Sequence, residues 1–180
     1  MTNIAERVTG HGLPTPAKWQ TSKAVADGGG GTIIAVADVA ATPERVFDLL
    51  TTTEVERWWR DPGHSYWKDW KADLRVQGQW SVTVCLNDGS TNAGWGEFVE
   101  IDAPHKLVMT RVFKQHPLQG KRETTITYRL ESIANGTRVT LREEGYVGRS
   151  DAAYANAERW ERVLGWLAAY IESGKSKSGT

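Results

Sequence analysis

The 180-residue chain contains 22 basic and 22 acidic residues, so no overall field favours binding to nucleic acid or to an anionic membrane. Its single cysteine, Cys85, excludes an intramolecular disulfide and a cysteine-rich zinc site and is typical of a reducing compartment. There is no apolar run long enough to span a bilayer. A cytoplasmic protein without nucleic-acid or membrane partners is therefore predicted.

The ends of the chain differ in character from its middle. Residues 1–31 show no sustained periodicity and finish with four consecutive glycines, which indicates a flexible N-terminal extension. Residues 173–180 are polar and are predicted to form a disordered tail. Between them, residues 32–172 are predicted to form one domain.

A strand followed by a short helix is predicted to open this domain. The β-branched segment 32–40 has strand character. Thr42 can cap a helix and Pro43 suits the first helical position, so the helix is expected to begin at residue 43.

A second short helix is predicted directly afterwards. Thr53 and Glu56 have the spacing of a capping box, and the segment ends on Trp58 and Trp59. Adjacent indoles point to different sides of a helix, so we expect one in the core and the other in a cleft, or both in the core.

The middle of the chain is predicted to be an antiparallel meander, because turn signals such as Asn135-Gly136 separate runs of strand character. The segment around His64 is expected to be a loop. The predicted strands are residues 72–76, 78–86, 94–101, 106–113, 123–132 and 136–144.

Apolar residues from about Asp151 to Glu172 recur with a period of 3.6, which predicts a long amphipathic helix. Its apolar face needs a partner, and the concave face of the sheet is the large surface available. The sequence therefore predicts an α+β helix-grip fold, in which a curved antiparallel sheet of about six to seven strands wraps around this helix.

Several segments match a known superfamily in their order and spacing. They are ATPERVFDLLT from residue 41, WW at 58–59, DLRVQGQW at 73–80, GWGEFVEIDAPHKLVMT at 94–110, GTRVTL from 136 and WERVLGWLAAYI at 160–171. With them the chain, from about Ile33 to Ile171, resembles the SRPBCC or START-like (Bet v 1-like) superfamily. Within it, the chain is similar to the C-terminal domain of the activator of the heat-shock protein 90 ATPase.

The resemblance implies a helix-grip fold, and its functions range from lipid and polyketide binding to cyclase chemistry and chaperone contact. The chain also departs from the usual pattern. Arg75-Val76-Gln77-Gly78 replaces RPGG, Arg111 stands where an aromatic residue often ends the strand, and Glu143 stands where a neutral residue or histidine is common.

Strand alternation predicts which side chains face the helix. Arg111, Tyr128 and Glu143 are polar exceptions on this inner face, so each needs a partner. Three alternatives are open for Arg111 and Glu143: a buried ion pair, a role in orienting a ligand, or exposure at the strand ends. The predicted inward residues are Trp80, Val82, Val84, Leu107, Met109, Arg111, Ile126, Tyr128, Leu130, Val139, Leu141 and Glu143.

Nine tryptophans indicate either an aromatic-walled cavity or a well-filled core. We expect the domain to bind a small hydrophobic or aromatic molecule between the C-terminal helix and the sheet. The predicted ligand-binding residues are Trp58, Trp59, His64, Trp80, Met109, Arg111, Tyr128, Glu143 and Trp160.

Two other functions are alternatives. A co-chaperone-like module would bind a chaperone or other protein through exposed aromatics such as Trp166 and Tyr170. A cyclase or dehydratase would use Arg111 to polarise a carbonyl and Glu143 or His64 to move a proton. No catalytic or metal-binding motif is recognised, no cofactor is expected, and the zero net charge permits a homodimer.

Overall fold

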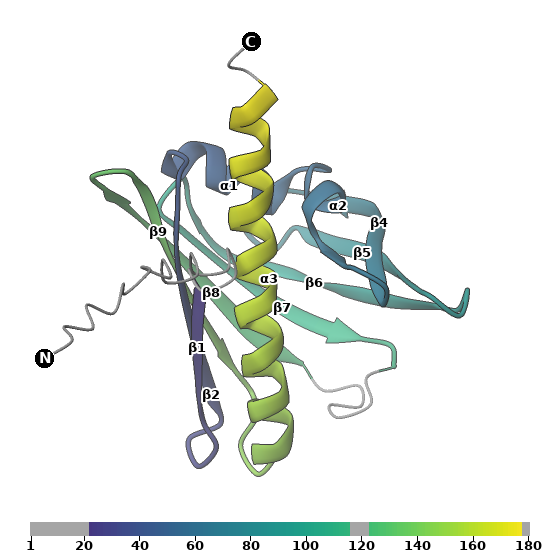
Figure 1. The fold of residues 1–180 in the computed structure, drawn as a ribbon. Coiled ribbons are helices and arrows are strands. Elements are labelled where there is room, and N and C mark those ends of the chain that lie inside the picture. Colours follow the sequence, from purple (N-terminus) through teal and green to yellow (C-terminus); the bar gives the residue numbers. More distant parts are fainter. Residues whose placement is uncertain (1–21, 116–122, 178–180) are drawn as a thin grey trace, which may run out of the picture.

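The computed structural model describes residues 22–115 and 123–177, and in it a nine-stranded antiparallel sheet curves around one long helix (Figure 1). The strands lie in the order β1-β2-β9-β8-β7-β6-β5-β4-β3. They are β1 (Ser22–Asp27), β2 (Thr32–Val39), β3 (Arg60–Asp61), β4 (Ser65–Ala72), β5 (Gln79–Leu86), β6 (Thr91–Asp102), β7 (Lys106–Phe113), β8 (Thr124–Ile133) and β9 (Gly136–Glu144). The helices are α1 (Pro43–Thr51), α2 (Val55–Trp58) and α3 (Ser150–Lys177).

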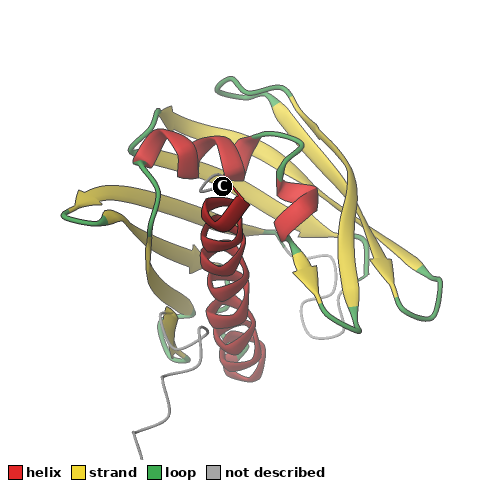
Figure 2. Cartoon of the chain, turned by 45° about the horizontal axis from the view of Figure 1, so that its top comes forward, coloured by secondary structure: helices red, strands yellow, loops and turns green. Residues whose placement is uncertain are grey.

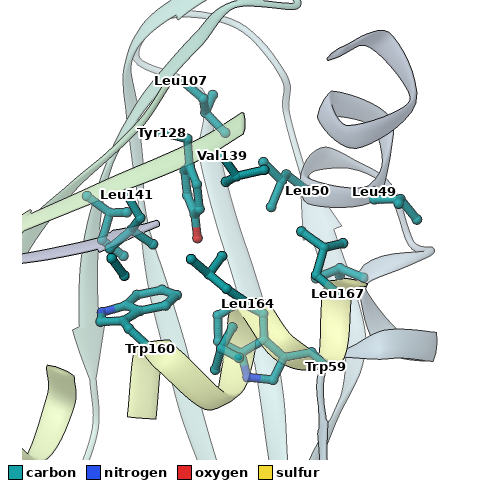
Figure 3. Close-up of a cluster of buried hydrophobic side chains, with 14 of the residues drawn as sticks. Leu49, Leu50, Trp59, Leu107, Tyr128, Val139, Leu141, Trp160, Leu164 and Leu167 are labelled. Atoms are coloured by element: carbon teal, nitrogen blue, oxygen red, sulfur yellow. The ribbon is translucent and has the colours of Figure 1, made fainter. Parts of the chain in front are cut away.

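The predicted helix-grip architecture is confirmed. Helix α3 crosses the concave face of the sheet, and α1 and α2 cover the same face at one end (Figure 2). The apolar stripe of α3 is buried along its length, from Ala153 through Trp160 to Ile171. The twelve residues predicted to face inward are all buried as well. Figure 3 shows part of the resulting core, with Leu164 and Leu167 of α3 facing Tyr128 and Val139 of the sheet.

The predicted number of six to seven strands is wrong. Strand β1 pairs with β2 in a segment that we expected to be flexible, because the glycines after it form a tight turn and not a hinge. Asp27 stabilises this turn by accepting hydrogen bonds from the backbone N–H groups of Gly29 and Gly30 at 3.0 and 2.9 Å. Gly31 lies at φ 66°, a conformation that favours glycine. Residues 1–21 and 178–180 lie outside the described residues, and α3 continues to Lys177, beyond the predicted end at residue 172.

Strands β3 and β4 occupy a segment that we expected to be a loop, whereas the expected strand 72–76 is largely loop. Strand β4 has a bulge between Lys68 and Lys71, with Asp69 at φ 57°, and this disrupts the two-residue period by which strands are recognised. After β4 the chain makes a tight turn, which is closed by a hydrogen bond from the Gly78 N–H to the Arg75 carbonyl at 2.8 Å.

The two short helices begin close to where the sequence predicts. The Thr42 hydroxyl caps α1 by accepting from the Arg45 N–H at 3.3 Å. The capping box predicted for α2 does not form. The Glu56 carboxylate accepts instead from the Trp70 N–H at 2.6 Å, and this contact ties α2 to β4.

The edge strand β1 is held by α3. The Ala24 N–H donates to the Glu161 carboxylate at 3.1 Å, and the Ser22 hydroxyl donates to the Glu161 carbonyl at 2.6 Å. The opposite edge of the sheet is β3, which has two residues.

Candidate ligand-binding site

A small cavity of about 20 Å³ lies between α3 and the sheet. Its wall is almost entirely aromatic and aliphatic, and it includes one charged residue, Arg111. The lining residues are Leu50, Val55, Trp59, Trp67, Trp70, Trp80, Met109, Arg111, Ile126, Tyr128 and Trp160.

Six of the nine predicted site residues line this cavity: Trp59, Trp80, Met109, Arg111, Tyr128 and Trp160. The other three do not. Trp58 packs beside Trp59, with ring centroids 5.2 Å apart, and donates to the Leu49 carbonyl at 2.9 Å. Glu143 contacts Arg111 and Trp160 from outside the lining, and His64 is exposed in the turn between β3 and β4.

Trp67 and Trp70 of β4 are the main residues that the sequence analysis missed. Residues three apart on a regular strand face opposite sides of the sheet. The bulge between Lys68 and Lys71 brings both indoles to the inner face, where they are 4% and 6% exposed. A pair of tryptophans spaced by three in a polar segment is the signal that could have indicated this.

The aromatic side chains form a continuous layer. Trp59 stacks on Trp67 with centroids 3.8 Å apart, and Trp70 stacks on Trp80 at 5.4 Å. Trp160 meets Trp59 edge to face at 5.6 Å. Such pairs contribute about 0.5–1.5 kcal/mol each beyond the area they bury.

Arg111 and Glu143 form a buried ion pair, with Nη2 and Oε1 2.5 Å apart and side chains 4% and 0% exposed. Exposure at the strand ends is thereby excluded. Glu143 Oε1 also accepts from the Thr124 hydroxyl at 2.6 Å, and Oε2 accepts from Trp160 Nε1 at 2.5 Å. Both carboxylate oxygens are thus occupied by protein donors.

The positive charge of Arg111 and the negative charge of Glu143 balance each other in this buried region. Burial disfavours the charged form of Arg111, but the attraction of Glu143 and the interactions with Tyr146 and Tyr128 together outweigh burial and raise the pKa of the guanidinium. Burial raises the pKa of the Tyr128 and Tyr146 hydroxyls, so both stay protonated at neutral pH. The cluster of Arg111, Glu143 and the two tyrosines therefore contains one positive and one negative charge.

The buried side-chain N–H groups of the tryptophans and of Arg111 fall into two sets, those with an acceptor and those without one. Trp58, Trp70, Trp80 and Trp160 donate to protein acceptors, for example Trp70 to the Thr51 carbonyl at 3.2 Å and Trp80 to the Thr110 carbonyl at 3.0 Å. Trp59 Nε1, Trp67 Nε1 and Arg111 Nε are buried without a hydrogen-bond partner. All three belong to residues that line the cavity.

Within residues 22–115 and 123–177, no three histidine, cysteine, aspartate or glutamate side chains gather as a metal site would require. None of the helices in these ranges combines the length and apolar character that crossing a bilayer requires.

Solved structures with this fold come from several bacteria. A protein from Rhodobacter sphaeroides is 18% identical, with a TM-score of 0.72 over 84% of this chain and 99% of its own. A protein from Chromobacterium violaceum is 23% identical, with a TM-score of 0.68 over 79% and 97% of the two chains. An AHSA1-like protein from Aeromonas hydrophila is 18% identical, with a TM-score of 0.66 over 80% and 94%. At these identities the likeness shows the fold.

A search of curated proteins finds no match. The model of the family described as Activator of Hsp90 ATPase homolog 1-like protein matches residues 40–172. The resemblance inferred from the sequence is confirmed. Because this match covers well over half of the 180 residues, the chain belongs to the Activator of Hsp90 ATPase homolog 1-like family.

Proposed function

We propose that this domain binds a small hydrophobic or aromatic molecule in the pocket between α3 and the sheet. The family indicates ligand binding or a co-chaperone-like role, and one observation favours the first. Three buried N–H groups in the pocket wall have no partner. Each such group costs about 1–3 kcal/mol, yet the same core pairs the N–H groups of four other tryptophans. A bound molecule would supply the missing partners.

The pocket must widen to admit such a molecule, because about 20 Å³ holds roughly one water-sized group. The wall best placed to move carries Trp67 and Trp70. It belongs to β4, which has only the two-residue β3 outside it and is weakened by its bulge. An outward shift of β3 and β4 would enlarge the pocket and leave the Arg111–Glu143 pair, on β7 and β9, in place.

Ligand contacts are assigned in this proposal to the six lining residues predicted from the sequence, with Trp67 and Trp70 added. Trp58 and Glu143 support this wall from behind. His64, at the tip of the β3–β4 turn, would move with the hairpin.

The proposal is tested with N-phenyl-1-naphthylamine, an uncharged probe that fluoresces in apolar surroundings. Wild type is expected to bind it, and Ile126→Trp, which fills the pocket, is expected to weaken binding at least about tenfold. Trp95→Phe, on the outer face of β6 at 41% exposure, is the control and should bind like wild type. Met109→Phe provides a second filling variant. Equal binding by wild type and both filling variants, each shown to be folded by circular dichroism, would contradict the proposal.

A co-chaperone-like role is the second candidate, and the family match favours it. The aromatics predicted to serve it are poorly available, because Trp166 and Tyr170 are half-buried against the core. The Tyr170 hydroxyl also donates to Glu54 Oε1 at 2.8 Å. Retention of purified Hsp90 on the immobilised protein, abolished by Trp166→Ala, would support this role, and no retention would count against it.

A further inference from the structure

We infer that the pocket selects a neutral carbonyl compound, with an apolar or aromatic body and an oxygen that accepts hydrogen bonds. This inference rests on the proposed function and narrows it to a ligand class. It follows from the kind of polar group left unpaired and from the charge balance around it.

The unpaired groups are all donors. An indole N–H and a guanidinium N–H can only donate, so none of these groups can satisfy another. The side chains of Trp59, Trp67 and Arg111 are 5%, 4% and 4% exposed, so bulk solvent does not satisfy them either. The complement of this wall is an acceptor, whereas an ammonium group, which can only donate, would place donor against donor.

The charge balance favours a neutral acceptor over a carboxylate. The charge of Arg111 is already matched by Glu143 at 2.5 Å. A carboxylate ligand would bring a second buried negative charge near Glu143 with no further cation in the lining. Arg159 of α3 lies outside the lining and is half-buried, and burial together with the charge of Arg111 lowers its pKa.

The arrangement of the rings also suits a flat carbonyl compound. Trp59 and Trp67 stack at 3.8 Å with their planes 12° apart, so an aromatic ligand can extend the same stack. A carbonyl oxygen has two lone pairs and can accept from two donors. A ketone therefore satisfies two of the three N–H groups, and a diketone or quinone can satisfy all of them.

The test compares three probes with one naphthalene body: 2-acetylnaphthalene, 2-isopropylnaphthalene and 2-naphthoate. Calorimetry of the full chain should show the ketone binding about tenfold more tightly than the hydrocarbon of similar shape. The ketone should also shift the indole N–H signals of Trp59 and Trp67 downfield in ¹H–¹⁵N spectra, with assignments made by Trp→Phe variants.

Two variants separate hydrogen bonding from packing. Trp67→Phe removes an unpaired donor and should reduce the ketone preference several-fold. Trp70→Phe is the matched control, because Trp70 lines the same pocket on the same strand but already donates to the Thr51 carbonyl. Because Trp70 lines the pocket, this variant should weaken binding of the ketone and of the hydrocarbon by the same factor, so the ratio of their affinities should stay at the wild-type value.

Two sets of results would contradict the inference, and they differ in what they mean for the proposed function. Equal affinity for the ketone and the hydrocarbon, tighter binding of 2-naphthoate, or unshifted Trp59 and Trp67 signals would overturn the inference and leave the proposed function standing. Failure of all three probes to bind would overturn the proposed function with it.

Discussion

The two sides of the buried aromatic layer differ in how their polar groups are paired. Near β9, Glu143 collects hydrogen bonds from Arg111, Thr124 and Trp160. Near β4, the rings of Trp59 and Trp67 stack closely, but their N–H groups have no acceptor. Both sides are equally well buried, so packing alone does not distinguish them. We therefore expect the β9 side to contribute mainly to stability, whereas the proposed ligand would meet the N–H groups of the β4 side together with Arg111 Nε, which is also unpaired.

The largest effect is expected from Glu143→Gln, which leaves the buried charge of Arg111 unbalanced. Unfolding free energy should fall by about 3 kcal/mol, measured by urea denaturation. The double variant Arg111→Met/Glu143→Leu removes both charges and should recover at least half of this loss. A loss below about 1 kcal/mol for Glu143→Gln would contradict the expected difference between the two sides, because the β9 side would then contribute little to the free energy of unfolding.

Gly96→Ala tests the packing around Trp80, whose indole N–H is paired with the Thr110 carbonyl. An added Cβ would lie 1.9 Å from the Thr110 carbonyl oxygen and 2.7 Å from Trp80 Nε1. The backbone of β6 must shift, so we expect a loss of about 2 kcal/mol in urea denaturation. Gly174→Ala in α3, where a Cβ meets nothing within 4 Å, is the control and should be neutral or slightly stabilising. Equal stability of the two variants would contradict the expected clash.

The same substitution, Trp→Phe, can be made on each side of the aromatic layer, so the stability costs of the two sides can be compared directly. Trp160→Phe removes the donor to Glu143 Oε2 and should cost about 2 kcal/mol, from an unsatisfied carboxylate oxygen and lost volume. Trp67→Phe also loses volume but removes a donor that has no acceptor, so its cost should be about 1 kcal/mol smaller. The difference is measured as the change in urea midpoint at constant slope. A larger cost for Trp67→Phe would reverse the assignment of roles.

The smallest effect concerns Glu54, a partly exposed counterpart of Glu143. Hydrogen bonds from Arg45 outweigh desolvation and, with the Tyr170 hydroxyl, lower the pKa of Glu54 from 4.5 to about 2. The folded pKa lies below the unfolded one, so this stabilisation is present above pH 4.5 and disappears as the pH falls towards 2. Glu54→Gln should cost about 1 kcal/mol at pH 7 after allowance for solvent screening, and progressively less below pH 4.5. A pH-independent cost would show that the contact is not ionic.

Regular elements could be predicted from the sequence. Strand β9 alternates without interruption, and β7 does so apart from the buried Val108, so their inward residues, Arg111 and Glu143 among them, followed from a two-residue period. Their contact with each other did not follow, because β8 lies between the two strands and the strand order depends on the whole fold.

Irregular elements could not be predicted. The bulge in β4 places Trp67 and Trp70 on one face, against the ordinary alternation of a strand. Strand β1 consists of small and polar residues and precedes four glycines, so its local pattern resembles a linker. Its pairing with β2 and its contacts with α3 are tertiary effects.

The contact between Ala24 and Glu161 bears on how copies of the protein meet. Unpaired N–H groups at the edge of a sheet invite strands from other molecules, and this is a common route to aggregation. Here α3 places a carboxylate on an N–H of β1, and the opposite edge, β3, is too short to serve as a template. Intermolecular strand pairing is therefore discouraged at both edges of the described sheet.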